Sequence, residues 1–103
     1  MNQALDNFLS LVLPSGRLLF GFDSLKAFNP ARVKLIVIME SASSKTRAAA
    51  LTYARTYNID HLKLVPTSVP QLIKGKNLAV FSVLDENIAS KIIKLVKEGD
   101  TYE

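Results

Sequence analysis

Three segments of the chain combine small residues with basic ones, a mixture that suits contact with phosphate groups. They are Ser15-Gly16-Arg17 with its continuation through Gly21 to Lys26, the turn from Glu40 to Lys45, and Lys74-Gly75-Lys76-Asn77. Glycine lets a backbone approach a ligand closely, and the free amides at a helix start can meet an anion. RNA recognition needs such donors, cations at the rim and a loop that reaches the bases. We therefore expect the three segments to meet at one end of a sheet and to form an RNA-binding surface.

Different residues of this surface are expected to contact phosphates and bases. Lys26, Lys76 and the amides of residues 21–24 are placed to hold phosphates, while Asp23 and Asn77 can reach base edges. The full set of candidate RNA-binding residues is Gly16, Arg17, Gly21, Asp23, Ser24, Lys26, Glu40, Lys45, Lys74, Gly75, Lys76 and Asn77. Glycine–lysine turns are also common on surfaces that bind nothing, so a merely solvated surface stays open as an alternative.

Catalytic patterns are almost absent from the sequence. His61 is the only histidine and there is no cysteine, which excludes Cys/His catalysis and thiolate zinc sites. No GxxxxGK[ST] loop occurs, and no G-x-G-x-x-G follows an expected strand. The carboxylates Glu40, Asp85 and Glu86 follow the two most apolar strands, but helix starts favour negative charge at such positions. We expect a protein that is not an enzyme and needs neither a cofactor nor a metal.

The composition is that of a small, basic, globular chain. Its 103 residues match one domain, spanning 1–103, and hydrophobic residues make up 49% of them. The net charge of +4 favours a phosphate-rich partner, because neutralising phosphates releases condensed counterions. The longest apolar runs, such as Leu35–Met39 and Leu78–Phe81, are far shorter than the ~20 residues that cross a bilayer. We expect a soluble, cytoplasmic, monomeric protein with no membrane partner.

Apolar periodicity and turn residues divide the chain into alternating helices and strands. Helices are expected over about 3–13, 23–28, 43–57 and 86–99, and strands over 17–20, 33–39, 61–65 and 78–84. Asp85 and one of Ser43 and Ser44 are suitable N-caps, and Gly99 is expected to end the last helix. The alternation predicts an α/β fold, a three-layer α-β-α sandwich with a mixed sheet of about four short strands. The central strands are expected to be parallel.

Several stretches occur in the order and spacing of a known family. They are Ser15-Gly16-Arg17-Leu18-Leu19-Phe20-Gly21, the run from Arg32 to Thr46, Tyr57-Asn58-Ile59, Val65-Pro66 and Gly75-Lys76. Together they resemble the kink-turn RNA-binding ribosomal protein family, the superfamily of ribosomal proteins L-seven-Ae and L-thirty-e. The likeness is strongest to the bacterial YlxQ-like branch of small proteins, and it covers roughly residues 5 to 97.

This resemblance implies both a fold and a ligand. Members of the family are α-β-α sandwiches that grip kink-turn RNA, a sharply bent internal loop flanked by sheared G·A pairs. They read this element with the start of the second helix and with a loop before the last strand. The implied partner is a ribosomal RNA or another kink-turn RNA, with the ribosome or translation factors as further partners.

At the second helix, the match to the family pattern is partial. The pattern is Gly-x-Asn-Glu-x-x-Lys, or Gly-Glu-Asp-x-x-x-Lys in the bacterial branch. Gly21 and Asp23 fall on matching positions, whereas Ser24 stands where kink-turn readers have Glu. The lysine position falls on Ala27 when residues are counted from Gly21, and on Lys26 when they are counted back from the next strand. A helix start displaced by one residue rotates by about 100°.

Two other positions differ from the family pattern. Val69-Pro70 replaces a Leu-Gly pair, and Pro70 removes a backbone donor and excludes positive φ. Glu40 matches the acidic residue after the second strand, but Ser41 occupies the next acidic position. Two functional hypotheses therefore stay open. The first is an accessory protein, ribosomal or ribosome-associated, that binds structured, kink-turn-like RNA. The second is a protein-interaction module that kept the fold but lost kink-turn recognition.

Overall fold

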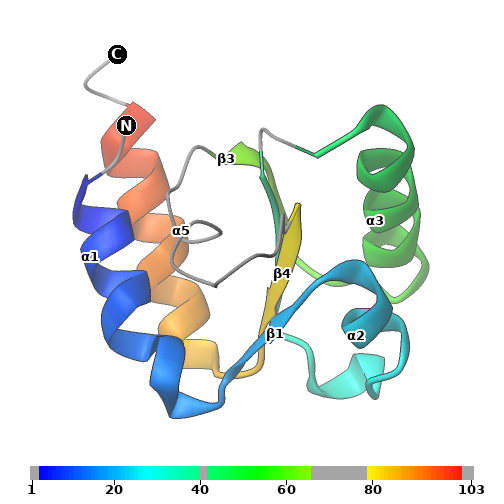
Figure 1. The fold of residues 1–103 in the computed structure, drawn as a ribbon, viewed down its shortest axis with the longest axis horizontal. Coiled ribbons are helices and arrows are strands. Elements are labelled where there is room, and N and C mark those ends of the chain that lie inside the picture. Colours follow the sequence, from blue (N-terminus) through cyan, green and yellow to red (C-terminus); the bar gives the residue numbers. More distant parts are fainter. Residues whose placement is uncertain (1–2, 40–41, 66–78, 101–103) are drawn as a thin grey trace.

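The computed structural model describes residues 3–39, 42–65 and 79–100, which form helices and strands in the predicted order (Figure 1). The helices are α1 (Gln3–Val12), α2 (Phe22–Lys26), α3 (Ser44–Thr56) and α5 (Glu86–Asp100), with 3-10 turns η1 (Leu13–Ser15) and η2 (Pro30–Arg32). The strands are β1 (Leu18–Phe20), β2 (Leu35–Met39), β3 (His61–Val65) and β4 (Val80–Val83). The prediction that Gly99 ends the last helix is wrong, since α5 continues to Asp100. A glycine costs a helix only about 1 kcal/mol, so it need not end one.

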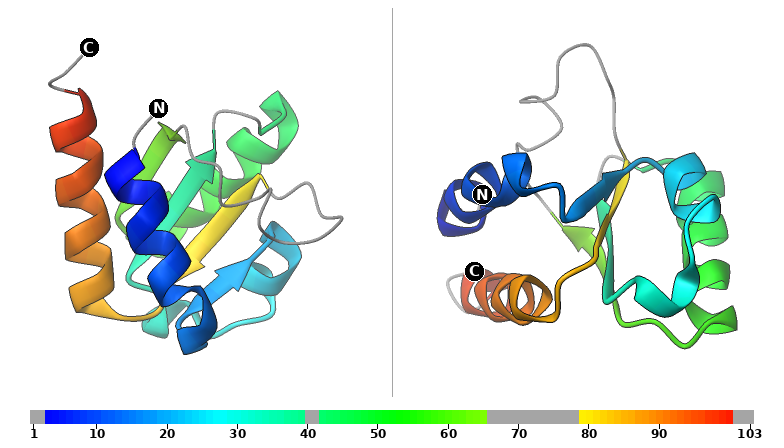
Figure 2. Two further views of the ribbon diagram at one scale, coloured as in Figure 1. Left: turned by 60° about the vertical axis from the view of Figure 1, so that its left-hand side comes forward. Right: turned by 90° about the horizontal axis from the view of Figure 1, so that it is seen from below.

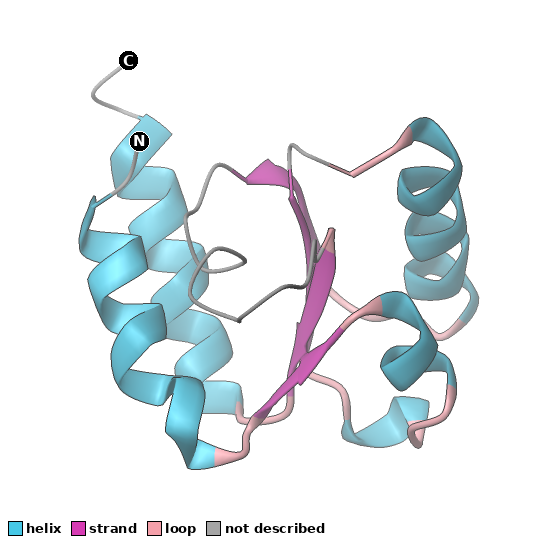
Figure 3. Ribbon diagram, in the orientation of Figure 1, coloured by secondary structure: helices cyan, strands magenta, loops and turns pink. Residues whose placement is uncertain are grey.

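The four strands form one sheet that is covered by helices on both faces. The strand order is β1-β4-β2-β3. α1 and α5 lie side by side on one face, and α2 and α3 lie on the other (Figures 1 and 2). Figure 3 shows the sheet as a thin layer between these two helical layers. The predicted three-layer α-β-α sandwich with a mixed sheet is confirmed.

The direction of β4 corrects one prediction about this sheet. β4 is antiparallel to both of its neighbours, β1 and β2, whereas β3 is parallel to β2. The two central strands are therefore antiparallel, not parallel as expected. Met39 of β2 pairs with Val65 and the adjacent Ile38 pairs with Val80, so β3 ends and β4 begins at the same edge of the sheet. The chain therefore leaves the sheet after β3 and re-enters it with β4 at the same edge.

This arrangement gives the sheet two chemically distinct edges. β1, β2 and β3 all point the same way, because β1 and β2 are each antiparallel to β4 and β3 is parallel to β2. We call the edge where these three strands end the carboxyl edge, and the edge where they begin the amino edge. α2 follows β1 and α3 follows β2, so both helices begin at the carboxyl edge.

β2 is the most deeply buried strand, as its unbroken apolar sequence predicts. All five of its residues are at most 2% exposed. Leu35, Val37 and Met39 contact the core on the α1/α5 face, while Ile36 and Ile38 contact the core on the other face. Each strand residue therefore stabilises one of two separate hydrophobic clusters.

The helices bury narrow stripes of small or branched residues against these clusters. On α3 the buried residues are Ala50 and Ala54, whose short side chains let the helix lie close to the sheet. On α5 the buried residues are Ala89, Ile92 and Leu95. The lysines Lys91, Lys94 and Lys97 are exposed, as predicted, although Lys97 also lines a hollow beside β3 and so does not lie on the outer side of α5.

An ion pair and a helix cap meet at the amino edge. Asp85 accepts a hydrogen bond from the Ile88 amide (3.0 Å), which confirms the predicted N-cap of α5. Its carboxylate also pairs with the Arg17 guanidinium, which comes from the residue before β1. The Ile88 amide and, to a smaller extent, Arg17 hold the pKa of Asp85 below its ordinary value.

The lowered pKa of Asp85 predicts a loss of stability in acid. A depressed folded-state pKa contributes stability that is complete above the unfolded-state value, about 3.9, and that is lost as the pH falls through the folded value. The free energy of unfolding should therefore decrease as the pH falls below about 4. Asp85→Asn keeps a capping side chain but cannot ionise, so this variant should show a flatter pH dependence in that range. Urea unfolding at a series of pH values measures both slopes, and equal slopes would contradict the assignment.

Ser82 places a hydroxyl group in the middle of the sheet. It lies on β4 between Leu19 of β1 and Ile36 of β2, and it is fully buried. Its Oγ has no hydrogen-bond partner in the described part of the chain. A buried polar group without a partner costs about 1–3 kcal/mol, so Ser82 lowers the stability of the sheet.

Replacing this hydroxyl should stabilise the protein. Ser82→Ala is expected to raise the free energy of unfolding by about 1 kcal/mol, because the desolvation cost of the hydroxyl disappears. Urea unfolding monitored by far-UV circular dichroism measures the change. Ala50→Ser adds a hydroxyl to a fully buried position of α3 and is expected to have the opposite effect. A Ser82→Ala protein that is clearly less stable than the parent would show that this oxygen has a partner.

Candidate RNA-binding site

The start of α2 depends on the backbone geometry of Gly21. This residue has φ 89° and ψ 153°, in a region that disfavours side chains, and it is the N-cap of α2. Its amide donates to the Val80 carbonyl (2.8 Å), which ties the end of β1 to β4. Leu25 is fully buried beneath the helix. The glycine and the leucine together set where the exposed side of this short helix lies on the carboxyl edge.

The exposed side of α2 carries both charged candidates. Asp23 and Lys26 form an ion pair of 3.6 Å, and the Lys26 ammonium also lies 5.2 Å from the centre of the Phe22 ring. Ser24 is exposed next to Asp23. The alternative position for the lysine, Ala27, is the C-cap of α2. The structure therefore pairs Lys26 with Asp23 and places Ala27 just after the helix.

The start of α3 presents basic residues without acidic ones. Ser43 caps the helix by accepting a hydrogen bond from the Thr46 amide (3.2 Å), and is the N-cap of the two serines that the sequence left open. No acidic residue lies in the first turn of α3, whereas Lys45 is exposed there. Arg47 donates to the Ala42 carbonyl (3.2 Å), and its Nε is buried without a partner among the described residues. A cation near the positive end of a helix slightly destabilises it, so Lys45 does not serve helix stability.

A polar and aromatic contact holds α2 and α3 together. The Tyr53 hydroxyl on α3 donates to the Leu25 carbonyl on α2 (3.3 Å). Burial, with a smaller effect of the neighbouring Tyr57, raises the pKa of Tyr53, so this hydroxyl remains a donor at neutral pH. The Phe22 ring packs edge-on against Tyr53, with 6.1 Å between ring centres. These contacts hold α2 against the second half of α3.

The structure confirms part of the predicted grouping of candidate residues. The candidates that it places on the carboxyl edge are Gly21, Asp23, Ser24, Lys26 and Lys45. Arg47 at the same edge was missed, because a lone arginine inside an alanine-rich helix gives no sequence signal. Glu40, Lys74, Gly75, Lys76 and Asn77, together with Val69-Pro70, lie outside the described residues.

Gly16 and Arg17 do not belong to this group, which corrects the prediction that they do. They precede β1, whereas Gly21 follows it, so the whole strand separates them from the start of α2. The Arg17 carbonyl accepts from the Leu84 amide (2.9 Å), and its guanidinium pairs with Asp85. Both contacts are at the amino edge. Arg17 thus has a structural partner at the opposite end of the sheet from the candidate site.

Comparisons with known proteins add information on the fold. No protein-family model and no curated protein matches the chain. A solved structure of a protein with unknown function from Bacillus halodurans is similar, with a TM-score of 0.77 and 21% sequence identity, over 94% of this chain and 99% of that one. At this identity the likeness shows a shared fold. In the part of the chain that the structure describes, no helix is long and apolar enough to cross a membrane, and no cluster of three or more potential metal ligands occurs.

Proposed function

We propose that this chain is a non-catalytic RNA-binding protein that binds structured, kink-turn-like RNA at the carboxyl edge of its sheet. One observation carries the proposal: the common direction of β1 and β2 brings the starts of α2 and α3 to the same edge. Lys45 is exposed there in the first turn of α3, and Lys26, the last residue of α2, reaches back to Asp23 near the start of that helix. The resemblance to kink-turn-binding ribosomal proteins supports the same surface. In this proposal the protein acts in the cytoplasm as a monomer, with ribosomal RNA or another kink-turn RNA as its ligand and the ribosome or translation factors as further partners.

The electrostatics of α3 support an anionic ligand. Its first turn has two basic residues, Lys45 and Arg47, and no acidic residue to offset the positive helix end. A phosphate group bound there would neutralise this charge and accept hydrogen bonds from free amides. The same contact would release counterions from the RNA, which makes its strength depend on salt.

The polar groups of α2 suit contacts with bases. The Asp23 carboxylate can accept hydrogen bonds from base amino groups, and the Ser24 hydroxyl can donate or accept them. The ion pair between Asp23 and Lys26 is exposed, and such pairs contribute little to stability. Both side chains can therefore exchange this contact for contacts with RNA at little cost.

A protein-interaction role is the alternative. Ser24 motivates it, because this residue occupies an exposed position of α2 where kink-turn readers have Glu. A pull-down whose captured partner survives nuclease treatment would favour this role over RNA binding.

A double substitution tests the proposed surface. Lys26→Gln combined with Lys45→Gln should lower the affinity for kink-turn RNA at least about tenfold and reduce the salt slope by about 2, one for each lost phosphate contact. The matched control combines Lys34→Gln with Lys91→Gln, which removes the same charge from exposed residues away from the carboxyl edge. Affinity is measured across a salt series with a kink-turn RNA and with a version that lacks the G·A pairs.

The outcomes separate three accounts. A loss confined to the Lys26/Lys45 variant, together with weaker binding to the RNA without G·A pairs, supports the proposal. Equal losses in both double variants would mean that only the total charge matters. Absence of binding by the parent protein to either RNA would make the protein-interaction role the better account.

Substitution of Lys45 should change the free energy of unfolding and the affinity for RNA in opposite directions. Lys45→Glu places a negative charge in the first turn of α3, which should raise the free energy of unfolding by about 0.3–1 kcal/mol. The same change should weaken RNA binding, because it opposes phosphates. Lys91→Glu makes the same charge change on α5 and should not weaken RNA binding. A Lys45→Glu protein that is less stable than the parent would indicate that Lys45 supports the fold.

A further inference from the structure

β3 forms an edge of the sheet whose outer side has no described neighbour. It pairs with β2 alone among the described strands. The Asp60 carbonyl accepts from the Ile36 amide (2.9 Å), and Leu62 pairs with Val37, so the backbone groups of Asp60 and Leu62 face β2. Because these groups alternate along a strand, those of His61 and the amide of Lys63 face outward. Beyond Leu62 the pairing becomes irregular, since β3 has one residue more than β2 before Val65 pairs with Met39. No described strand pairs with these outward groups.

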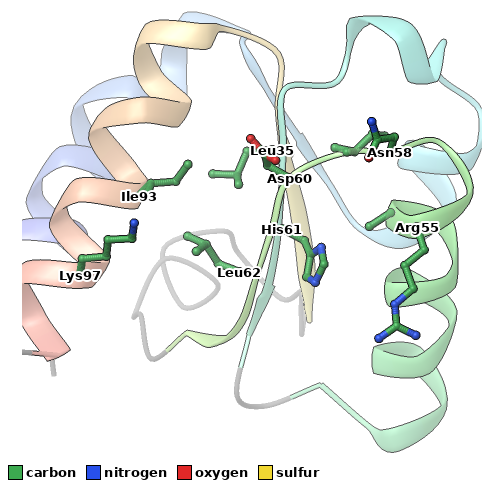
Figure 4. Close-up of a pocket in the computed structure, with 10 residues that line it drawn as sticks. Leu35, Arg55, Asn58, Asp60, His61, Leu62, Ile93 and Lys97 are labelled. Carbon is green, nitrogen blue, oxygen red and sulfur yellow. The ribbon is translucent and has the colours of Figure 1, made fainter.

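A hollow of about 520 Å³ lies beside the start of this strand. Figure 4 shows Ile93 and Lys97 reaching toward β3 from α5, with Arg55 on the α3 side. His61 and Leu62 of β3 lie between them and point to opposite sides of the sheet. Leu35 of β2 is fully buried and forms part of the lining. The hollow is therefore lined by residues of α3 on one face of β3 and by residues of α5 on the other face.

The two sides of the edge differ in chemistry. On the α3 side, Arg55 lines the hollow together with His61, and Lys63 follows two residues along β3; both cations are exposed. On the α5 side, Leu62 and Ile93 are half-buried. Successive side chains of a strand point to opposite faces, so a strand added here would place alternate residues against cations and against apolar groups.

The basic residues near this edge disfavour pairing with a second copy of this chain and favour a partner of opposite charge. A lysine on an edge strand disfavours pairing with a second copy, since this would bring like charges together. Arg55, Lys63 and Lys97 stand around the edge, and Asp60 is the one carboxylate among the described residues that line the hollow. A strand with acidic residues would find complementary charge instead.

We propose that the outer edge of β3 binds an extended acidic peptide as an added strand, with acidic residues toward Arg55 and Lys63 and apolar residues toward Leu62 and Ile93. Strand addition uses backbone hydrogen bonds for affinity and alternate side chains for selectivity. This site is separate from the proposed RNA surface, because the hollow lies at the amino edge and the RNA surface at the carboxyl edge. Its test does not depend on whether the protein binds RNA.

The probe is a blocked peptide, Glu-Val-Glu-Val-Glu-Val-Glu, titrated calorimetrically into the full chain. Two further peptides are matched to it: one with Lys in place of every Glu, and one with alternate backbone amides methylated. We expect binding of the first peptide, none of the lysine peptide, and at least about a tenfold loss on methylation, because the methyl groups block strand pairing. Amide chemical shifts of residues 61–63 should change during the titration.

Protein variants locate the site. Lys63→Pro removes an outward amide that the sheet does not use, so it should leave the fold intact and weaken binding at least about tenfold. Arg55→Glu should also weaken binding, whereas Lys91→Glu, the same charge reversal elsewhere, should not. Far-UV circular dichroism checks folding, and the methylated peptide remains decisive if Lys63→Pro does not fold.

Several results would overturn the proposal. These are no binding of the acidic peptide, equal binding of the lysine or methylated peptide, or unchanged binding by a folded Lys63→Pro protein. Shift changes at Lys26 and Lys45 in place of residues 61–63 would also contradict it. Displacement of the acidic peptide by an oligouridine that shifts the same residues would assign the edge to nucleic acid instead.

Discussion

The hydrogen bonds that hold β4 between β1 and β2 determine the rest of the structure. At the carboxyl edge, the Gly21 amide donates to Val80 and the Met39 amide donates to Ala79, both at 2.8 Å. At the amino edge, the Lys34 amide donates to Val83 (2.8 Å) and the Leu84 amide donates to Arg17 (2.9 Å). β4 is therefore bonded to both neighbours at both of its ends. Because it is antiparallel to each, β1 and β2 must be parallel to each other, and the helices that follow them must begin at one edge.

The two edges of the sheet consequently have different chemistry. At the carboxyl edge, the first turn of α3 has basic residues and no acidic one, a combination that costs stability and that a bound anion would offset. At the amino edge, Arg17 and Asp85 satisfy each other and stabilise the cap of α5. The hollow beside β3 adds a second surface, where open backbone groups and cations occur together. In this account RNA binds at the carboxyl edge of the sheet, and a peptide binds along the outer edge of β3.

Much of the fold follows from the sequence because burial leaves a clear pattern. The apolar run of β2 predicts a strand covered on both faces, and all five residues are buried. The caps Ser43 and Asp85 were predictable because their side chains bond to amides three residues away. The direction of β4 relative to its neighbours was not predictable. The alternation of apolar residues shows which face of the sheet a side chain lies on, but not which strand lies beside it or in which direction that strand runs.

The candidate sites were less predictable, because they depend on contacts between distant residues. Gly16 and Arg17 adjoin Gly21 in sequence, yet the length of β1 places them at opposite edges. The hollow at β3 combines Arg55, His61 and Lys97, and the last of these was interpreted only as part of an exposed helix face. No local sequence pattern predicts that the end of α3 and residues of α5 lie beside the same strand.

Chemical-shift mapping of the isotope-labelled protein during titration with a kink-turn RNA tests the central claim most directly. If RNA binds at the carboxyl edge, the largest amide shifts should occur at Gly21 to Lys26 and in the first turn of α3. The amides of Arg17, Asp85 and Lys91 should change little. The largest shifts at the amino edge or along α5 would contradict the account, because the α-helix that begins at that edge, α5, carries Glu86 in its first turn.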